Sequence, residues 1–410
     1  MMERAQFENS TGSIGLTPVP RLNSALIRRV NTARVFHALR DHPGSSQRGL
    51  CTLTQLDAST VSSVVAKLEA DRIVRRLDSN RSGQAGRPER MLQINRDGGV
   101  LIGAAIETDS IRLIATGLDG ERRGALSVKP GRTVDIAIEN LQGGVAELLA
   151  LLRLDLADVR GIGVGQHGLI DRAGHLVLAP RMGWRDVPLG ARLRRLFPVP
   201  VYLENDTKAA AIAEHLFGSC QGVADFVLLH GGSGIGGALF LQGALYHGIG
   251  LGGELGHMKV FPHGRPCSCG GNGCLEAYVS EPAIRAQLAE NGRFSPNAMA
   301  AEQDAASDPA VQAVLDEAGW VLGLAMANLV NLLNPRRIVL AGSLAASSGH
   351  LLPNARSALA ENVLPVMGSE VEIMVSALGA DAVALGGVGL AMEGFLPLSG
   401  KLDPRWADRA

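Results

Sequence analysis

Cysteine is scarce in this sequence, and two signatures of exported or membrane-bound proteins are missing. Only 5 cysteines occur among 410 residues, and the count is odd. The N-terminus lacks the charged and then apolar pattern of a secretion signal, and no uninterrupted apolar run reaches about 18 residues. These absences argue against a disulfide framework and against a membrane-spanning helix. We therefore expect a cytoplasmic protein with no membrane partner.

Charged residues are few, and they are unevenly distributed. Lys, Arg, Asp and Glu make up 19% of the chain, hydrophobic residues make up 46%, and the formal net charge is −1. This composition is typical of a globular protein with large cores, and the length suggests two or three domains. Residues 21–97 nevertheless hold 14 basic and 7 acidic side chains, which gives +7 there and −8 elsewhere. The asymmetry indicates a nucleic-acid-binding domain on an acidic body; an arginine-rich solvated surface is the alternative.

Three of the cysteines lie in one glycine-rich segment together with a histidine. Cys267, Cys269 and Cys274 fall within 8 residues, and His257 precedes the first of them by 10 positions. Zinc prefers four tetrahedral thiolate and imidazole ligands, and glycines allow a short loop to present them to one ion. We predict a structural Zn²⁺ site formed by these four residues, with His263 as a lower-ranked imidazole. Free or disulfide-paired thiols are the alternative.

The first 97 residues divide into a tail and a small helical domain. Residues 1–20 contain Ser, Thr, Gly and Pro without apolar periodicity, so we expect a flexible tail. Apolar stripes then predict a helix from Ser24 to just before His42, a second helix over 47–53, and a third helix capped by Ser59.

The third helix has one apolar face and one face of small hydroxyl groups. The apolar positions are Val61, Val64, Val65 and Leu68. Strands expected at 73–77 and 91–95 flank a basic turn, so the segment has the pattern of a winged helix-turn-helix, whose third helix enters the major groove. The predicted DNA-contacting residues are Ser59, Thr60, Ser62, Ser63, Lys67 and Arg87. A domain that makes only protein contacts is the alternative.

From Gly99 onward, strands alternate with helices, which indicates α/β architecture. Strands are expected at 100–106, 111–116, 159–164, 199–203, 226–229, 337–341 and 371–375, and helices at 134–153, 207–217 and 309–333, with a last helix ending near 395. Asn205 and Asp206 follow one of these strands. Polar groups at the carboxyl end of a strand lie where α/β folds bind ligands, and the same residues suit a helix cap.

The motifs of the second half resemble the ROK family, which groups sugar-responsive repressors with sugar kinases. Gly253-Glu254-Leu255-Gly256-His257, followed by Cys267-x-Cys269-Gly-x-x-Gly273-Cys274-x-Glu276, is similar to the zinc and sugar motif of this family. The resemblance runs from about residue 24 to about residue 395. In the basic turn, Gly86-Arg87-Pro88 resembles the transcriptional repressor branch, which carries an N-terminal winged helix-turn-helix.

The resemblance implies a fold and a set of sugar-binding residues. It implies a two-lobed, actin-like or hexokinase-like α/β domain at 98–400, preceded by the helical winged domain with its β wing at 21–97. One lobe would comprise 98–204 with the last helix at 380–396, and the other would comprise 205–379. The implied sugar-binding residues are Asn205, Asp206, Glu254, His257 and Glu276. In the sugar kinases of the family, the aspartate that matches Asp206 is the general base.

This chain departs from the pattern of the family in three places. The kinases carry Asp-x-Gly-Gly-Thr in the first hairpin, whereas this chain has Ala105-Ile106-Glu107-Thr108-Asp109. Phosphate loops need converging backbone amides, and carboxylates there would repel the anion. His167 stands where proline is common, and Arg181 stands in place of asparagine. Arg181 suits either an anionic group on the ligand or an exposed position beside the site. The turn from Gly232 to Gly237 resembles the second phosphate loop.

These observations together predict a sugar-responsive transcriptional repressor of carbohydrate metabolism genes and not an enzyme. A sugar or sugar phosphate would change the angle between the lobes, and with it the spacing of two DNA-binding domains in a homodimer or homotetramer on double-stranded operator DNA. The alternative is a glucokinase-like sugar kinase that uses ATP and Mg²⁺, with Asp206 as its catalytic base and an added DNA-binding domain. A bifunctional protein is a third possibility.

Overall fold

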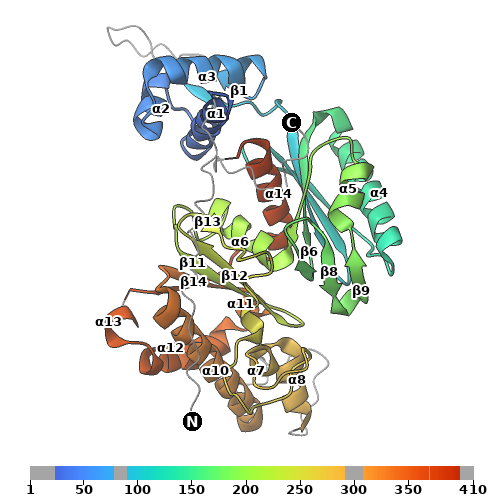
Figure 1. The fold of residues 1–410 in the computed structure, drawn as a ribbon, viewed down its shortest axis with the longest axis vertical. Coiled ribbons are helices and arrows are strands. Elements are labelled where there is room, and N and C mark those ends of the chain that lie inside the picture. The colour runs from blue at the N-terminus through green and yellow to red at the C-terminus, as the bar shows by residue number, and fades with distance from the viewer. Residues whose placement is uncertain (1–23, 78–89, 291–307, 369, 398–410) are drawn as a thin grey trace, which may run out of the picture.

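The computed structural model describes residues 24–77, 90–290, 308–368 and 370–397, which form a small helical domain and a larger body built on two five-stranded sheets (Figure 1). The expected tail at 1–20, the turn that contains Arg87 and residues 398–400 lie outside the described residues. The predictions made for those segments therefore stay predictions.

The N-terminal domain has the element order of a winged helix-turn-helix. Its helices are α1 (Ser24–Asp41), α2 (Gln47–Thr54) and α3 (Ala58–Ala70), and its antiparallel strands are β1 (Val74–Arg76) and β2 (Leu92–Ile94). Phe36 of α1, Leu50 of α2, Val65 of α3 and Leu92 of β2 are all almost fully buried in one cluster. We call this domain the head. The predicted order of three helices followed by two strands is confirmed.

The cap of the third helix differs from the prediction. Asp57, and not Ser59, is the N-cap of α3, because its side chain accepts from the backbone N of Thr60 at 2.8 Å. Ser59 is the second residue of the helix, where its hydroxyl donates to Asp57 at 2.6 Å. An aspartate at this position also places a negative charge at the positive end of the helix dipole, which a serine cannot do.

The first sheet of the body has the strand order β10-β6-β3-β4-β5. Its strands are β3 (Val100–Ile106), β4 (Ile111–Gly117), β5 (Arg122–Val128), β6 (Val159–Gln166) and β10 (Val201–Asn205). Strand β3 is buried along its whole length, because Ile102 and Ala104 pack in the core that contains α4 (Val134–Leu152) while Leu101 and Ala105 face the opposite core. Strand β10 runs through Asn205, two residues beyond the predicted end at Leu203.

The second sheet repeats the topology of the first, with the order β13-β12-β11-β14-β15. Its strands are β11 (Phe226–Gly231), β12 (Ile235–Leu241), β13 (Ala244–Leu245), β14 (Arg337–Gly342) and β15 (Glu372–Val375). In each sheet, three consecutive strands form an antiparallel meander, and two later strands add in parallel beside the first strand. The predicted α/β architecture is thus present twice.

Helices cover both sheets, and small elements connect them. The remaining helices are α5 (Leu189–Leu196), α6 (Asp206–Leu216), α7 (Glu276–Val279), α8 (Glu281–Glu290), α10 (Pro309–Leu333), α11 (Ser343–Ala346), α12 (Ser348–Asn362), α13 (Pro365–Gly368) and α14 (Ala382–Phe395). Short 3-10 turns are η1 (Leu156–Asp158), η2 (Pro180–Met182), η3 (Leu255–His257) and η4 (Gly379–Asp381), and a further sheet is formed by β7 (Leu169–Ile170), β8 (Leu176–Ala179) and β9 (Trp184–Val187).

Helix α10 is a helix of the protein core. Among the described residues it is the one helix long and apolar enough to span a membrane, but 67% of its most apolar window is buried inside the molecule. It packs along α12 and shares a core with Val227, Leu229 and Ile338 of the second sheet. Its apolar composition is therefore accounted for by packing.

The last helix, α14, crosses back onto the first sheet, as predicted, and also touches the head. It packs against β3, β6 and α6 (Figure 1). Three glycines permit this close packing: a Cβ atom on Gly103 would lie 1.9 Å from the Ala384 carbonyl, one on Gly163 would lie 1.8 Å from the Gly387 carbonyl, and one on Gly386 would lie 2.0 Å from the Ala209 carbonyl. Helix α14 is thus fixed between the sheet and α6.

Three contacts join α1 of the head to the end of α14. The ring of Phe36 meets that of Phe395 edge-on with centroids 6.4 Å apart, and His37 Nε2 lies 2.9 Å from the Leu396 carbonyl. Arg40 Nη1 lies 3.0 Å from the sulfur of Met392. The head therefore rests on the same helix that packs between the first sheet and α6.

Candidate functional site

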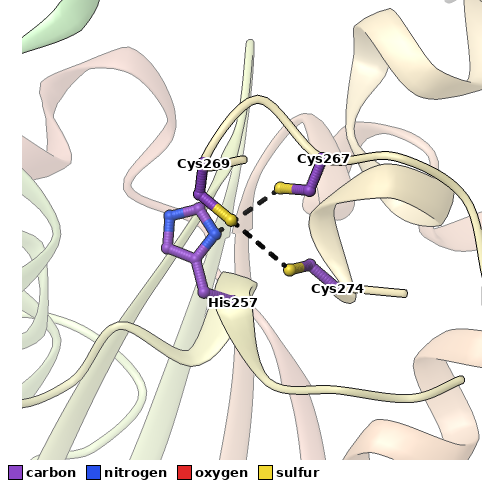
Figure 2. Close-up of side chains that lie close together, drawn as sticks. All are labelled: His257, Cys267, Cys269 and Cys274. Carbon is purple, nitrogen blue, oxygen red and sulfur yellow. Dashed lines mark hydrogen bonds between the residues drawn. The ribbon is translucent and has the colours of Figure 1, made fainter. Parts of the chain in front are cut away.

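The four predicted zinc ligands lie together around one point (Figure 2). The ligand atoms of His257, Cys267, Cys269 and Cys274 all lie within 4.8 Å of one another. The Sγ atoms of Cys269 and Cys274 are 3.7 Å apart, and Nδ1 of His257 is 3.7 Å from Sγ of Cys267. His263, the lower-ranked imidazole, is exposed and is not part of this group.

These distances and donor types fit zinc. Two thiolates bound to one tetrahedral ion at about 2.3 Å lie roughly 3.7 Å apart, the separation seen here. One imidazole and three thiolates fill the four positions of a structural site and leave none open for chemistry. The loop reaches this arrangement through Gly273, which has a φ of +69° and packs so closely on Phe261 that a Cβ atom would lie 1.4 Å from its carbonyl oxygen.

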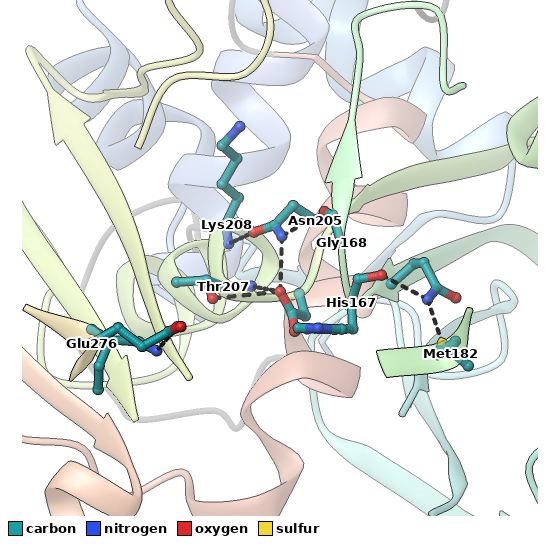
Figure 3. A network of polar contacts seen from close by, with 10 residues as sticks. His167, Gly168, Met182, Asn205, Thr207, Lys208 and Glu276 are labelled. Carbon is teal, nitrogen blue, oxygen red and sulfur yellow. Dashed lines mark hydrogen bonds and ion pairs between the residues drawn. The ribbon is translucent and has the colours of Figure 1, made fainter. Parts of the chain in front are cut away.

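A second polar group forms where β10 ends and α6 begins (Figure 3). Asn205 caps α6, because its Oδ1 accepts from the backbone N of Lys208 at 3.1 Å. Its Nδ2 donates to the Gly168 carbonyl at 3.0 Å and to Asp206 Oδ1 at 2.9 Å. The interpretation of Asn205 as a helix cap is confirmed, and the cap also orients the neighbouring carboxylate.

Both oxygens of Asp206 have hydrogen-bond partners. Oδ1 accepts from Asn205 and from the backbone N of Thr207 at 2.8 Å, and Oδ2 lies 3.0 Å from Nδ1 of His167. Burial alone would raise the pKa of Asp206, but the hydrogen bond and charge of His167 lower it below its ordinary value, with help from His230 and the Thr207 amide. Asp206 is therefore held as a carboxylate.

The other implied sugar-binding residues come from the segment that carries the four predicted zinc ligands. Glu254 precedes η3, and its carboxyl interacts electrostatically with Lys208, His257 and Asp206; partial burial raises its pKa. Glu276 begins α7, where Oε2 accepts from the backbone N of Ile235 at 3.0 Å and Oε1 accepts from Ser268 at 3.0 Å. The structure thus brings Glu254 within electrostatic reach of Asp206 and His257, and it connects Glu276 to the predicted zinc ligands through the 3.9 Å contact with Cys267.

The glycine-rich turn between β11 and β12 packs on these residues. A Cβ atom on Gly234 would lie 2.4 Å from Oε2 of Glu276, and one on Gly236 would lie 2.0 Å from Oγ1 of Thr207. Arg181 Nη2 lies 3.4 Å from the position of the same Gly234 Cβ atom, so this exposed arginine reaches the second sheet from η2. The glycines of this turn therefore have a packing role that is independent of any phosphate.

The first hairpin presents acidic groups near Asp206. Glu107 follows β3, and its backbone N donates to the Ser110 carbonyl at 3.0 Å to close the turn. Burial raises the pKa of Glu107, and the charges of Asp109 and Asp206 raise it further, whereas Arg112 lowers it. An added phosphate would meet the same repulsion.

On the head, the predicted DNA-contacting face of α3 is accessible. Ser59, Ser62, Ser63 and Lys67 are exposed and Thr60 is half-buried, while Val61, Val64, Val65 and Leu68 are buried, as the sequence predicted. Lys67 forms an ion pair with Asp71 at 3.0 Å, one turn along the helix. The helix and its two faces are confirmed; the DNA contacts stay a prediction.

Sequence reasoning missed three groups near Asp206. His230 ends the apolar run of β11 and is electrostatically coupled to Asp206 and His167, and burial lowers its pKa. Glu204 is 1% exposed and pairs with His247 at 2.8 Å, and Lys208 is 3% exposed. A titratable residue within an apolar strand is the signal that would have revealed His230 and Glu204, whereas Lys208 lies in α6 and has no such signal.

Comparison with known proteins relates both parts of the chain to known families. The pattern of the ROK family matches residues 101–393, and that of the MarR family matches residues 29–85. The xylose repressor of Bacillus spizizenii is 30% identical over 382 residues, which cover 92% of this chain and 98% of the relative.

The chain is also similar to a transcriptional regulator of known structure and to a sugar kinase. The crystal structure of a ROK family transcriptional regulator, a homolog of the E. coli MLC protein, has a TM-score of 0.79 and 26% identity, covering 90% of this chain and 97% of the other. The glucokinase of Halalkalibacterium halodurans is 34% identical over 250 residues, which cover 56% of this chain and 76% of the relative.

Proposed function

The chain belongs to the ROK family, and on that premise we propose that it is a sugar-responsive transcriptional repressor of carbohydrate metabolism genes. It combines the actin-like and hexokinase-like α/β fold of that family with an N-terminal winged helix-turn-helix. The observation that carries the proposal is the extent of the similarity. The xylose repressor aligns with 92% of the chain, so the alignment includes the head, whereas the glucokinase aligns with 56%.

The head would bind operator DNA through α3. Small hydroxyl side chains at Ser59, Ser62 and Ser63 allow the helix to approach base edges closely, and Lys67 supplies a positive charge for phosphate. Thr60 belongs to the same helix turn, and Arg87 would contact DNA from the turn between β1 and β2. Such a protein acts in the cytoplasm, where the DNA is. Two heads in a homodimer or homotetramer would match the two halves of a palindromic operator.

The charges around Asp206 favour a neutral sugar as the effector. Glu107, Asp206, Glu254 and Glu276 contribute carboxyl groups, and carboxylates accept hydrogen bonds from sugar hydroxyls while repelling phosphate. The name of the xylose repressor makes D-xylose the first candidate. Arg181 is the group that would favour a sugar phosphate, so both classes belong in a binding screen.

A structural zinc would hold the sugar-binding residues in place. His257 would serve as ligand to both metal and sugar, and Glu254 and Glu276 flank the ligand segment at its two ends. The ion would supply rigidity and no reaction step, because the three cysteines and the histidine complete its coordination.

The signal would travel from the sugar to the head through α6 and α14. Asp206 is the first residue of α6, α6 packs along α14, and α14 touches Phe36, His37 and Arg40 of the head. A sugar that prefers one angle between the two sheets would therefore also favour one placement of the head. The lobe limits expected from the sequence, 98–204 with 380–396 and 205–379, follow the two sheets in this proposal.

A DNA-binding assay with matched variants tests the proposal. Fluorescence anisotropy with labelled DNA from upstream of the gene, with and without D-xylose, should show tight binding that the sugar changes. Ser62→Glu puts a carboxylate on the DNA-contacting face of α3 and should weaken DNA binding at least about tenfold. Ser127→Glu, the same change on exposed β5 of the body, should leave it unchanged. The repressor proposal fails when no condition gives DNA binding.

The second candidate function is an ATP- and Mg²⁺-dependent sugar kinase, which the 34% identity to a glucokinase favours. Two features of this chain count against it: the acidic turn at Glu107-Thr108-Asp109, and the fixed carboxylate of Asp206, whose lowered pKa makes it a weak base. Sugar-dependent ADP release that disappears in Asp206→Asn would establish the kinase. A positive result in both assays would establish a bifunctional protein.

A further inference from the structure

One histidine beside Asp206 uses only one of its two ring nitrogens in the hydrogen bonds of the described residues. His167 follows β6, and the next residue, Gly168, turns the chain with a φ of +119°. Nδ1 of His167 lies 3.0 Å from Oδ2 of Asp206. Nε2 has no hydrogen-bond partner among the described residues, and 33% of the side chain is exposed. Asp206 therefore fixes the ring through Nδ1 (Figure 3), while the side chain stays partly exposed.

The contact with Asp206 determines how the ring can meet a ligand. Because a carboxylate can only accept, the hydrogen between the two groups belongs to Nδ1. Nε2 then carries a hydrogen only when the ring is protonated, and in that state it is a charge-assisted donor. Oδ1 of Asp206 is already bonded to Asn205 and Thr207, so the aspartate cannot rotate away from the ring without losing those bonds.

We propose that His167 contacts the bound sugar directly, with Nε2 donating a hydrogen bond to a sugar oxygen while Nδ1 stays bonded to Asp206. This inference rests on the proposed function and adds a residue to the sugar site. It also assigns a chemical requirement to the effector, which must present an oxygen acceptor beside Asp206. The same residue makes sugar binding sensitive to pH.

The charged groups around the ring determine the direction of that sensitivity. Burial alone would lower the pKa of His167, but the hydrogen bond and charge of Asp206 on α6 outweigh it, and the pKa is raised. Glu254 raises it further, Arg181 of η2 lowers it, and His230 of β11 is coupled to the same pair. His167 is therefore half protonated at its raised pKa and increasingly protonated below it, and the donor at Nε2 disappears as the pH rises through that value.

The expected consequence is a sugar affinity that falls with rising pH. A charge-assisted hydrogen bond is about twice as strong as a neutral one, so losing it should weaken binding about five- to tenfold. By linkage, a ligand that prefers the protonated ring must bind with uptake of a proton when the pH is near the pKa of His167.

The test measures D-xylose, D-glucose and N-acetyl-D-glucosamine binding by calorimetry from about pH 6 to about pH 8.5. Buffers of different ionisation enthalpy report the proton uptake. The wild-type chain should lose affinity for its sugar about five- to tenfold over this range. His167→Gln should bind more weakly at low pH and show a flat profile without proton uptake. His175→Gln, in the neighbouring turn and paired with exposed Asp186 at 2.7 Å, should keep the wild-type profile.

Three outcomes would overturn the inference. An unchanged affinity and pH profile in a folded His167→Gln variant removes His167 from the site and leaves the proposed function intact. If that variant fails to fold, the test is an NMR titration of the histidine Cε1 protons in the wild-type chain, with and without sugar. A sugar that binds without changing the pKa of His167 would contradict the contact. If D-xylose, D-glucose and N-acetyl-D-glucosamine all fail to bind the wild-type chain, this inference fails, whereas the repressor proposal is decided separately by DNA binding.

Discussion

At the scale of single residues, the hydrogen-bond partners of a side chain determine its pKa and its chemical role. Asp206 matches the aspartate that the resemblance to the sugar kinases implies as a general base, yet His167, Asn205 and Thr207 bind both of its oxygens and its pKa is lowered. A general base works best with a pKa near the operating pH. The same carboxylate is well suited to hold a hydroxyl group in place, because it stays charged and fixed. Binding a sugar for sensing requires only such a fixed and charged hydrogen-bond acceptor.

Cys269→Ser tests the zinc site at the same scale. Serine is a poor zinc ligand, so the bound metal should fall from about one ion per chain to less than half, and the sugar response should weaken with it. Metal content by mass spectrometry and sugar affinity by calorimetry are the measurements. Cys51→Ser, a partly buried cysteine of the head, is the matched control and should retain both properties. Full metal occupancy in Cys269→Ser would contradict the ligand assignment.

At the scale of elements, α14 owes its position to glycines. Gly103 and Gly163 lie on the sheet and Gly386 lies on the helix, and each allows a backbone approach that a methyl group would block. Two arginines from different strands, Arg112 and Arg122, pair with Asp381 at 2.9 Å and 2.7 Å and fix the start of the helix. Close packing leaves the helix little freedom to move independently of the sheet, which is what a transmitting element requires.

A pair of glycine substitutions tests this packing. Gly386→Ala would bring a methyl group to 2.0 Å from the Ala209 carbonyl and should lower the free energy of unfolding by about 1–3 kcal/mol. Gly143→Ala on the exposed face of α4 meets nothing within 4 Å and should raise it by about 0.5–1 kcal/mol. Urea unfolding measures both. Wild-type stability in Gly386→Ala would mean that α6 and α14 separate easily.

At the scale of the whole molecule, the contact between head and body contains a buried histidine. His37 is 3% exposed, its Nε2 lies 2.9 Å from the Leu396 carbonyl, and its Nδ1 has no partner among the described residues. Burial lowers its pKa from 6.5 to about 4, with Arg40 acting in the same direction. The contact between head and body in the folded protein therefore requires the neutral ring of His37.

Acidification should destabilise this contact between head and body. Above pH 6.5 His37 is neutral in both the folded and the unfolded chain; below it only the unfolded chain binds the proton, until the pH reaches about 4. The free energy of unfolding should thus decrease over this window, by about 2 kcal/mol at pH 5. Thermal unfolding at pH 7 and pH 5 measures the loss. His37→Gln should lose less stability between pH 7 and pH 5 than the wild-type chain. His42→Gln, at an exposed position just after the same helix, should lose as much as the wild-type chain. An equal loss in both variants would exclude His37 as the cause.

The sequence by itself determined the local features of this protein. The cluster of four possible metal ligands, the helices and strands, the faces of α3 and the order of the motifs all follow from the spacing of residues near one another in the chain. For the same reason Asp57 was missed as a cap: Ser59 is equally acceptable from composition, and only the backbone path of the turn shows which side chain reaches the Thr60 amide.

Only the tertiary structure decided which distant groups meet. His167 and Asp206 are separated by 39 positions, and His37 and Leu396 by 359, so no local pattern links them. The repeated sheet topology and the glycine contacts of α14 likewise come from packing between segments far apart in the chain. The physical reason is that burial and pKa depend on every group within a few ångströms, whereas the sequence orders groups only along the backbone.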